Sequence, residues 1–318
     1  METAAENKKF DRTKAFKIFG VVLAFLCVLV LIYWLIFGRN SESTDDAYVA
    51  GSQVQIVAQI EGAIAAVNVS ETQAVKEGQV LFKIDPTEAK IASEKADIDL
   101  LNAYLEYQKR NSLQGDAAVS REELDHSYLN LRKLAESARQ AYINLLRVEV
   151  QSPTNAILAK RYAQIGQRVA PGTALGLLVA KDEIWVDANF KEDQLRNIRV
   201  GQPVKLESDI YGGKIEYRGI VVGFAPGTGS TLALLPAQNA TGNWVKVVQR
   251  LPVRIALDGE QLKGFPLRIG LSMNVKVDTS NHAGVPLQAM ESGNSQDTNI
   301  YLKQYELAES HINSILHR

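Results

Sequence analysis

The chain has 318 residues, which suggests two or three structural units at roughly 150 residues each. Its 35 lysines and arginines nearly balance its 36 acidic residues, so no global basic field attracts nucleic acid. A mean hydropathy of −0.10 excludes a protein with many membrane spans. Cys27 is the only cysteine, which excludes an intramolecular disulfide and a cysteine-based zinc site. Because the four histidines are scattered along the chain, we also expect no metal site.

One apolar segment, residues 18–37, has twenty residues without a charge. A helix of that length is about 30 Å long and matches the hydrocarbon core of a bilayer. A cleaved signal peptide is the alternative, but its apolar region would be about 7–15 residues long. The segment therefore predicts a retained transmembrane helix.

The charges on either side of this segment predict its orientation. Only Arg39 follows the segment closely, whereas five basic residues precede it: Lys8, Lys9, Arg12, Lys14 and Lys17. Since basic residues remain on the cytoplasmic side, we expect residues 1–17 in the cytoplasm. The protein would then cross the membrane once, with about 280 residues on the far side.

Two later segments share a short pattern of strands. After a linker and first strand at residues 38–53, the segment 54–85 contains Val75-x-x-Gly78-x-x-Leu81, and the segment 150–180 contains Val169-x-x-Gly172-x-x-Leu175. In each, the glycine falls at a turn and apolar residues enter a strand. The pattern predicts one split β-sandwich with an insertion between its halves.

The insertion, residues 86–149, has the pattern of two helices. Asp85 is the expected N-cap of the first helix, and Ser120 opens a capping box with Glu123 at the start of the second. Apolar residues recur every seven positions, which is typical of a coiled coil. The first series is Ile91, Ile98 and Leu105 with Leu101 on the same side; the second includes Leu124, Leu131, Ala138, Leu145, Leu134, Ala141 and Val148. We expect an antiparallel hairpin roughly 40 Å long.

The remainder of the chain predicts a second β-domain and a tail. Strand patterns with Gly and Pro turns at residues 181–279 favour a closed β-barrel. Residues 280–318 end in an amphipathic helix that would dock on the barrel, on a neighbouring subunit or on the membrane surface. The expected fold is thus an elongated, multidomain α+β protein with an N-terminal transmembrane helix.

The order of these parts, together with several runs of residues, resembles the HlyD/EmrA membrane fusion proteins, which are periplasmic adaptors of efflux and secretion systems. The runs that carry the resemblance are T-D-D-A-Y-V-A-G (44–51), W-V-D-A-N-F-K-E (185–192), L-L-P-A-Q-N-A-T-G-N-W (234–244), K-V-V-Q-R-L-P-V-R-I (246–255) and P-L-R-I-G-L-S (266–272). The similarity covers nearly all of residues 10–280 outside the hairpin, and it implies that the split β-sandwich is lipoyl-like. The expected hairpin is much shorter than is usual among such proteins.

The resemblance implies a function in multidrug efflux and a set of partners. It implies a homo-oligomer that links an EmrB-like major facilitator antiporter of the inner membrane to a TolC-like outer-membrane channel. It also implies that the channel meets the hairpin tip, at a pattern matched here by Lys109, Arg110, Leu113 and Ser120. Leu113 and Ser120 fit that pattern, Lys109 replaces an arginine, and Arg110 departs from a leucine.

A long loop between barrel strands is a second candidate site. Residues 225–244 exceed the usual length of a structureless loop and have apolar anchors at Leu232, Leu234, Leu235 and Trp244. We expect this loop to contact the pump or an adjacent adaptor.

No pattern in the sequence predicts catalysis. The helical insertion occupies the connection on which lipoyl carriers present their lysine, so we expect no cofactor, no catalytic residue and no metal. Three alternatives remain: an adaptor for another secreted substrate, as in HlyD; an adaptor that itself binds drug; and a membrane-tethered enzyme, which would need a clustered catalytic set.

Overall fold

The computed structural model describes residues 17, 19–29, 40–113, 119–229, 231, 248–290 and 297–317. Residues 19–29 are helical, whereas residues 18 and 30–37 of the expected transmembrane segment lie outside the described residues. Among the described parts of the chain, no helix is both long enough and apolar enough to cross a membrane.

The chain forms two compact units. The first contains residues 1–50 and 185–292, and the second contains residues 51–184 and 293–318. Two long strands, β1 (Ser41–Val57) and β8 (Ala174–Lys191), contribute residues to both units. Each unit is therefore assembled from segments far apart in the sequence.

The first unit is a β-barrel. Its strands follow the order β1-β12-β9-β10-β11-β8, with antiparallel pairing between neighbours, and β1 also pairs with β8. The further elements of this unit are η2 (Gln194–Arg196), β9 (Pro203–Ser208), η3 (Gly212–Lys214), β10 (Glu216–Phe224), β11 (Arg250–Leu257), α4 (Gly259–Gly264) and β12 (Ser272–Asp278). This agrees with the barrel predicted for residues 181–279, and the polar stretch after β8 forms a short 3₁₀ turn.

Alternation of buried and exposed residues along the barrel strands produces its core. In β9 and β12 every second residue is buried, as expected for strands with one face turned inward. The phenol of Tyr217 is buried in this core, where its hydroxyl donates to the carbonyl of Phe265 at 3.0 Å, and burial raises the pKa of Tyr217 to about 12.

Polar contacts inside the barrel unit hold residues 44 and 46 of the T-D-D-A-Y-V-A-G run in place. Asp46 accepts hydrogen bonds from Asn189 at 3.1 Å and from Arg250 at 2.6 Å, and Thr44 donates to the carbonyl of Asn189 at 2.9 Å. Asp46 thus ties β1 to β8 and β11.

The second unit contains the split sandwich. One sheet has the order β5-β4-β2-β7, and β3 pairs with β6, which pairs with the first half of β8. The bounds are β2 (Gly62–Val67), β3 (Ala74–Val75), β4 (Val80–Ile84), β5 (Glu149–Gln151), β6 (Ala156–Arg161) and β7 (Arg168–Val169).

The repeated pattern forms equivalent turns in the two halves. Gly78 and Gly172 have φ angles of +77° and +88°, a region that glycine reaches without steric cost. The valine before each glycine and the leucine after it are buried in one shared core. The two halves therefore have the same glycine turn and share one core, as the repeated pattern predicts.

Two helices, α2 (Thr87–Ser112) and α3 (Arg121–Leu146), lie between β4 and β5 and pack against each other; we call them the hairpin. At 26 residues each, they are about 39 Å long. The first helix begins one residue later than expected. Pro86 is its N-cap, and Asp85 accepts hydrogen bonds from the backbone and hydroxyl of Thr87 at 3.1 and 2.7 Å.

The seven-residue series predicted for the first helix is wrong as a packing seam. Ile91, Ile98 and Leu105 are 61%, 59% and 57% exposed, and Leu101 is also exposed. The residues of α2 that are buried are Ser93, Leu100 and Ala103. Residues can recur every seven positions on either side of a helix, and here the side with Leu100 and Ala103 packs against α3 and α5.

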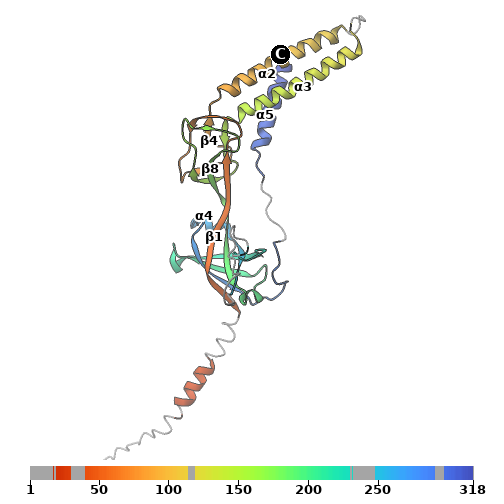
Figure 1. The fold of residues 1–318 in the computed structure, drawn as a ribbon. Coiled ribbons are helices and arrows are strands. Elements are labelled where there is room, and N and C mark those ends of the chain that lie inside the picture. The colour runs from red at the N-terminus through yellow and green to blue at the C-terminus, as the bar shows by residue number, and fades with distance from the viewer. Residues whose placement is uncertain are drawn as a thin grey trace, which may run out of the picture. The chain divides into compact units, whose positions relative to one another are not determined.

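That third helix is α5 (Ile300–Leu316) at the C-terminal end of the chain. It belongs to the same unit as the hairpin and runs beside α2 and α3 (Figure 1). The tail helix therefore docks on the hairpin of its own chain, and the expected docking on the barrel, a neighbouring subunit or the membrane is not what the structure has.

A glycine in the barrel offers a direct test of its packing. A Cβ atom at Gly219 in β10 would lie 2.7 Å from the carbonyl oxygen of Ala256 and 2.8 Å from the Cγ2 atom of Ile255. We expect Gly219→Ala to lower the free energy of unfolding by about 1–3 kcal/mol, measured by urea denaturation. Gly213→Ala is the matched control, because its Cβ would meet only the Glu207 carboxylate at 4.0 Å. Equal stability of the two variants would contradict the tight packing of β10 on β11.

Candidate functional site

The hairpin and α5 form the candidate site, and their shared core explains why they stay together. Four residues of the hairpin and two of α5 are buried in this cluster: Leu100, Ala103, Leu131, Ala138, Ile312 and Ile315. Ile312 and Ile315 of α5 pack with leucine and alanine side chains of α2 and α3 in this cluster. The burial of Ile312 and Ile315 is the main contribution that holds α5 in place.

Polar contacts fix α5 in one register on the hairpin. His311 lies 2.9 Å from the carboxylate of Asp97 on α2, and its ring stacks on Tyr142 of α3 with 4.0 Å between centroids. Two residues earlier in α5, Glu309 lies 2.7 Å from Arg139, and the same guanidinium lies 5.6 Å from the ring centroid of Tyr305.

Arg139 is the charged centre of this contact. Its guanidinium also donates to Glu136 on its own helix, and this hydrogen bond raises the pKa of Arg139, with the nearby carboxylate of Glu309 acting in the same direction. The side chain is only 15% exposed, so its charge needs these partners. Asp97, Arg139 and His311 therefore align α5, whereas the isoleucines provide most of its binding.

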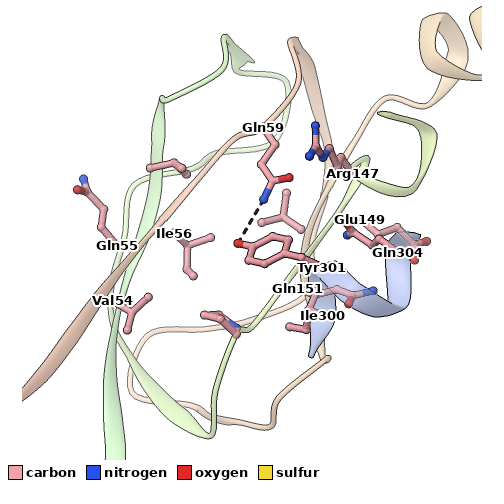
Figure 2. Close-up of a pocket in the computed structure, with 13 residues that line it drawn as sticks. Val54, Gln55, Ile56, Gln59, Arg147, Glu149, Gln151, Ile300, Tyr301 and Gln304 are labelled. Carbon is pink, nitrogen blue, oxygen red and sulfur yellow. Dashed lines mark hydrogen bonds between the residues drawn. The ribbon is translucent and has the colours of Figure 1, made fainter. Parts of the chain in front are cut away.

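The start of α5 closes a small cleft against the sandwich. The cleft has a volume of about 90 Å³, and the ring of Tyr301 enters it, where Gln59 donates to the Tyr301 hydroxyl at 3.5 Å (Figure 2). Ligand pockets for drug-sized molecules are about 300–1,000 Å³. This cleft is too small for such a molecule, and its function is to seat the first turn of α5.

The four residues predicted at the hairpin tip lie near one another in the described chain. Lys109 and Arg110 are in the last turn of α2, Leu113 is its C-cap, and Ser120 is the N-cap of α3. Residues 114–118 lie outside the described residues. The assignment of these four residues to a channel contact stays a prediction.

Arg110 connects the two helices just below the tip. Its guanidinium donates to the carboxylate of Glu106 at 2.6 Å and to the carbonyl of Glu123 on α3 at 3.2 Å. The arginine that departs from the expected leucine therefore contributes a contact within the chain. Lys109 has no ion-pair partner among the described residues and is exposed.

Ser120 forms the complete capping box predicted from the sequence. Its hydroxyl accepts from the backbone of Glu123 at 3.2 Å, and its own backbone donates to the Glu123 carboxylate at 2.9 Å. Hydrogen bonds from the backbone and then from the hydroxyl of Ser120 lower the pKa of Glu123. The tip thus has a defined start for α3.

The other predicted site cannot be placed. Leu232, Leu234, Leu235 and Trp244 all lie in a segment outside the described residues. Among the described residues, no group of three or more His, Cys, Asp and Glu side chains could hold a metal ion.

The docking of α5 was the feature that sequence reasoning did not find. Its amphipathic pattern predicts a helix that docks on an apolar surface, but the pattern does not identify the hairpin as that surface. The partner surface on α2 and α3 combines Leu100 and Leu131 with Ala103 and Ala138, a mixture that does not mark a docking site in the sequence.

Comparisons with known proteins agree with this architecture. The family model described as "RND MFP, barrel-sandwich hybrid domain" matches residues 52–181. The chain is 39% identical to the multidrug export protein EmrA of Escherichia coli K12, with 81% of each chain covered. It is 37% identical to the fatty acid resistance protein FarA of Neisseria gonorrhoeae, with 90% of this chain and 88% of the relative covered.

Solved structures show the same fold. A MacA–MexA chimera that contains the α-hairpin domain of Pseudomonas aeruginosa MexA has a TM-score of 0.58 at 20% identity, covering 76% of this chain and 82% of the chimera. The membrane fusion protein Spr0693 of Streptococcus pneumoniae R6 has a TM-score of 0.51 at 19% identity, covering 76% and 99%.

Fold and relatives together define a membrane fusion protein, which is an adaptor and not an enzyme. The chain belongs to the EmrA family of these proteins.

The capping box provides a test with a defined pH dependence. We expect Ser120→Ala to raise the pKa of Glu123 part of the way to its ordinary value, because the hydroxyl bond is lost while the backbone bond remains. A carboxylate with a lowered pKa stabilises the folded chain above its ordinary pKa, and this contribution is lost as the pH falls through the lowered value. The measurement is an NMR titration of the Glu123 carboxyl carbon. Ser120→Thr keeps the hydroxyl and should leave the pKa lowered; an unchanged pKa in the alanine variant would refute the assignment.

The docking of α5 is tested by placing a charge in its core. Ile312 is 2% exposed, so Ile312→Asp buries a carboxylate without a partner. We expect hydrogen-exchange protection of residues 300–316 to fall by at least about a hundredfold, because α5 leaves the hairpin. Asn313→Asp adds the same group one residue later on the exposed side and should leave protection unchanged. Equal protection in both variants would show that Ile312 does not anchor the helix.

Proposed function

We propose that this chain is the periplasmic adaptor subunit of a tripartite multidrug efflux pump. It would link an EmrB-like major facilitator antiporter of the inner membrane to a TolC-like outer-membrane channel as a homo-oligomer. The observation that carries the proposal is the 39% identity to a multidrug export protein over 81% of both chains. The barrel, the split sandwich and the hairpin provide the framework that such a connection needs.

The same proposal includes the location of the chain. The uncharged segment at residues 18–37 would anchor it in the inner membrane, with residues 1–17 in the cytoplasm. Because the span carries no Asp, Glu, Lys, Arg or His, proton coupling would belong to the antiporter.

The exported compounds are proposed to be hydrophobic or amphipathic small molecules. Relatives at 39% and 37% identity carry the names multidrug export protein and fatty acid resistance protein. Drugs and fatty acids share a large apolar surface. An adaptor for a different secreted substrate stays the alternative.

The length of the hairpin decides how far its tip can extend toward an outer-membrane channel. The 317 positions aligned with the Escherichia coli relative cover 81% of this chain's 318 residues, so about sixty positions have no counterpart here. The alignment with the Neisseria gonorrhoeae relative has a similar deficit, with 347 positions covering 90% of the chain. This supports the expectation of a shortened hairpin. We propose that the tip residues Leu113 and Ser120 make the channel contact, and that the loop 225–244 contacts the pump or a neighbouring adaptor.

Drug susceptibility of the host tests the proposed function. We expect deletion of the gene to increase susceptibility to hydrophobic drugs, and full-length protein to restore resistance. Leu113→Asp should fail to restore it at equal protein levels, because a charge at the tip opposes an apolar contact. Asn111→Asp, which adds the same charge to an exposed position two residues earlier, should restore resistance.

Two results would contradict different parts of this proposal. If deletion leaves susceptibility unchanged, the efflux function is wrong. If Leu113→Asp and Asn111→Asp both restore resistance fully, the function stands but the tip contact is wrong. Cysteine cross-linking from Leu113→Cys to outer-membrane channels, with Cys27→Ser as background, would then identify any other arrangement.

A further inference from the structure

The cleft at the start of α5 contains polar side chains that have no partner within the described chain. The Nε atom of Arg147 and the Oε1 atom of Gln59 are buried there without a hydrogen bond. Gln304 is only 9% exposed, and its amide forms no hydrogen bond with a described residue. Figure 2 shows Arg147 and Gln304 to one side of the Tyr301 ring. Because a buried polar group without a partner is costly, these three groups point to a polar ligand in the cleft.

The N-terminus of α5 adds hydrogen-bond donors to the same cleft. Its N-cap, Asn299, forms no side-chain cap, and the first N–H group of the helix to reach a carbonyl is that of Lys303, 2.9 Å from Asn299. The N–H groups of Tyr301 and Leu302 thus have no partner among the described residues, and Ile300 and Tyr301 line the cleft. A helix N-terminus carries a partial positive charge and binds anions.

Gln59 can present a further donor at small cost. Its Nε2 atom donates to the Tyr301 hydroxyl at 3.5 Å, which is long for a hydrogen bond. A half-turn of the amide lets the hydroxyl donate to Oε1 instead and frees the NH₂ group for a ligand. Donors therefore outnumber free acceptors in the cleft, as expected for an anion site.

The charges around the cleft also favour an anion. Arg147 has no ion-pair partner among the described residues, whereas Glu149, the one carboxylate that lines the cleft, lies 3.3 Å from Lys83. An open groove of about 410 Å³ adjoins the cleft and adds Lys303, which also has no ion-pair partner in the described part of the chain. Three basic side chains thus accompany one carboxylate, and the local potential is positive.

The adjoining groove gives an apolar surface to whatever carries the anion. Besides the residues that it shares with the cleft, its lining is mostly apolar and includes Pro86, Leu145, Leu146, Val148 and Leu307. Leu307 is 54% exposed there. A short hydrocarbon chain attached to an anionic group in the cleft would lie on these side chains.

The size of the cleft limits the ligand to one anionic group. Its volume of about 90 Å³ excludes a drug-sized molecule. A water molecule takes about 30 Å³ in the liquid, so the cleft has room for a group of a few heavy atoms.

We propose that the cleft, besides seating the first turn of α5, binds an oxyanion, which is a carboxylate or phosphate group. The ligands would be the guanidinium of Arg147, the amides of Gln59 and Gln304, and the N-terminus of α5. A guanidinium suits both groups because it can bind two oxygens at once. Since α5 provides part of the site, a bound anion holds α5 in its docked position. The inference does not rest on the proposed efflux function, because the anion need not be exported.

Hydrogen exchange of the full-length protein in lipid nanodiscs tests the site. Chloride is replaced by phosphate or by acetate at constant ionic strength and neutral pH. Binding to the docked helix alone slows its opening by a factor of 1 + [anion]/Kd, so we expect exchange of residues 300–316 to be about tenfold slower at ten times the Kd. Exchange of strand β12 in the barrel should not change. If neither anion slows exchange of α5 at any concentration in the titration, the proposal is wrong.

Substitutions of Arg147 show whether the effect comes from this cleft. Arg147→Gln should abolish the slowing by anions, and Arg147→Lys, which keeps the charge without the planar fork, should keep part of it. Arg132→Gln is the matched control, because Arg132 is an exposed arginine of the same helix, and its response should equal that of the parent. Rates with and without anion are compared within each variant, so a change in the docking of the free protein does not enter. An equal response in Arg147→Gln and the parent would overturn the proposal.

A series of straight-chain carboxylates distinguishes a free anion from the headgroup of an amphipathic molecule. If the chain lies in the groove, the Kd should fall about fourfold for each CH₂ group from acetate to hexanoate. Leu307→Asn should then remove this gain without changing the Kd of acetate. If acetate and hexanoate bind equally, the ligand is a free anion and the groove is not part of the site. Both outcomes support the oxyanion site.

These measurements are separate from those on efflux. Hydrogen exchange requires no transport, so an anion effect can be present in a protein that fails to export drugs. Conversely, absence of any anion effect would leave the proposed efflux function intact.

Discussion

The hairpin depends on one hydrophobic core that two distant segments share. Residues from 54–85 and from 150–180 bury their apolar side chains together in the split sandwich. Hydrogen bonds join the first and last turns of the insertion to this core: the backbone of Ile84 donates to Val148 at 2.9 Å. Because the two ends of the insertion are held side by side, α2 and α3 must run antiparallel. If the core were lost, the helices would have no common base.

On this base the third helix adds a second constraint. Burial of Ile312 and Ile315 gives α5 its affinity, and the contacts of His311 and Arg139 give it one register. The hairpin is thus a bundle of three helices along part of its length, not a two-stranded coiled coil. Whereas α5 covers one side of the hairpin, Ile91, Ile98 and Leu105 on the outer face of α2 are exposed.

This arrangement explains how so short a hairpin is stabilised. A two-helix hairpin of about 39 Å has little core of its own, and each helix relies on packing for stability. The added helix provides that packing from the same chain. The capping box at Ser120 and the bridge from Arg110 to the carbonyl of Glu123 then order the end that is furthest from the core.

Features that depend only on neighbouring residues can be predicted from the sequence. The glycine turns after Val75 and Val169, the capping box of Ser120 and Glu123, and the alternation in the barrel strands follow from local sterics and hydrogen bonding, and all of them are present. Long runs of matching residues also determined the family. Tertiary structure alone decided which side of α2 is buried and where α5 docks. Seven-residue spacing is satisfied by an exposed row as well as by a buried one, and only packing against α3 and α5 selects Leu100 and Ala103 over Ile98 and Leu105.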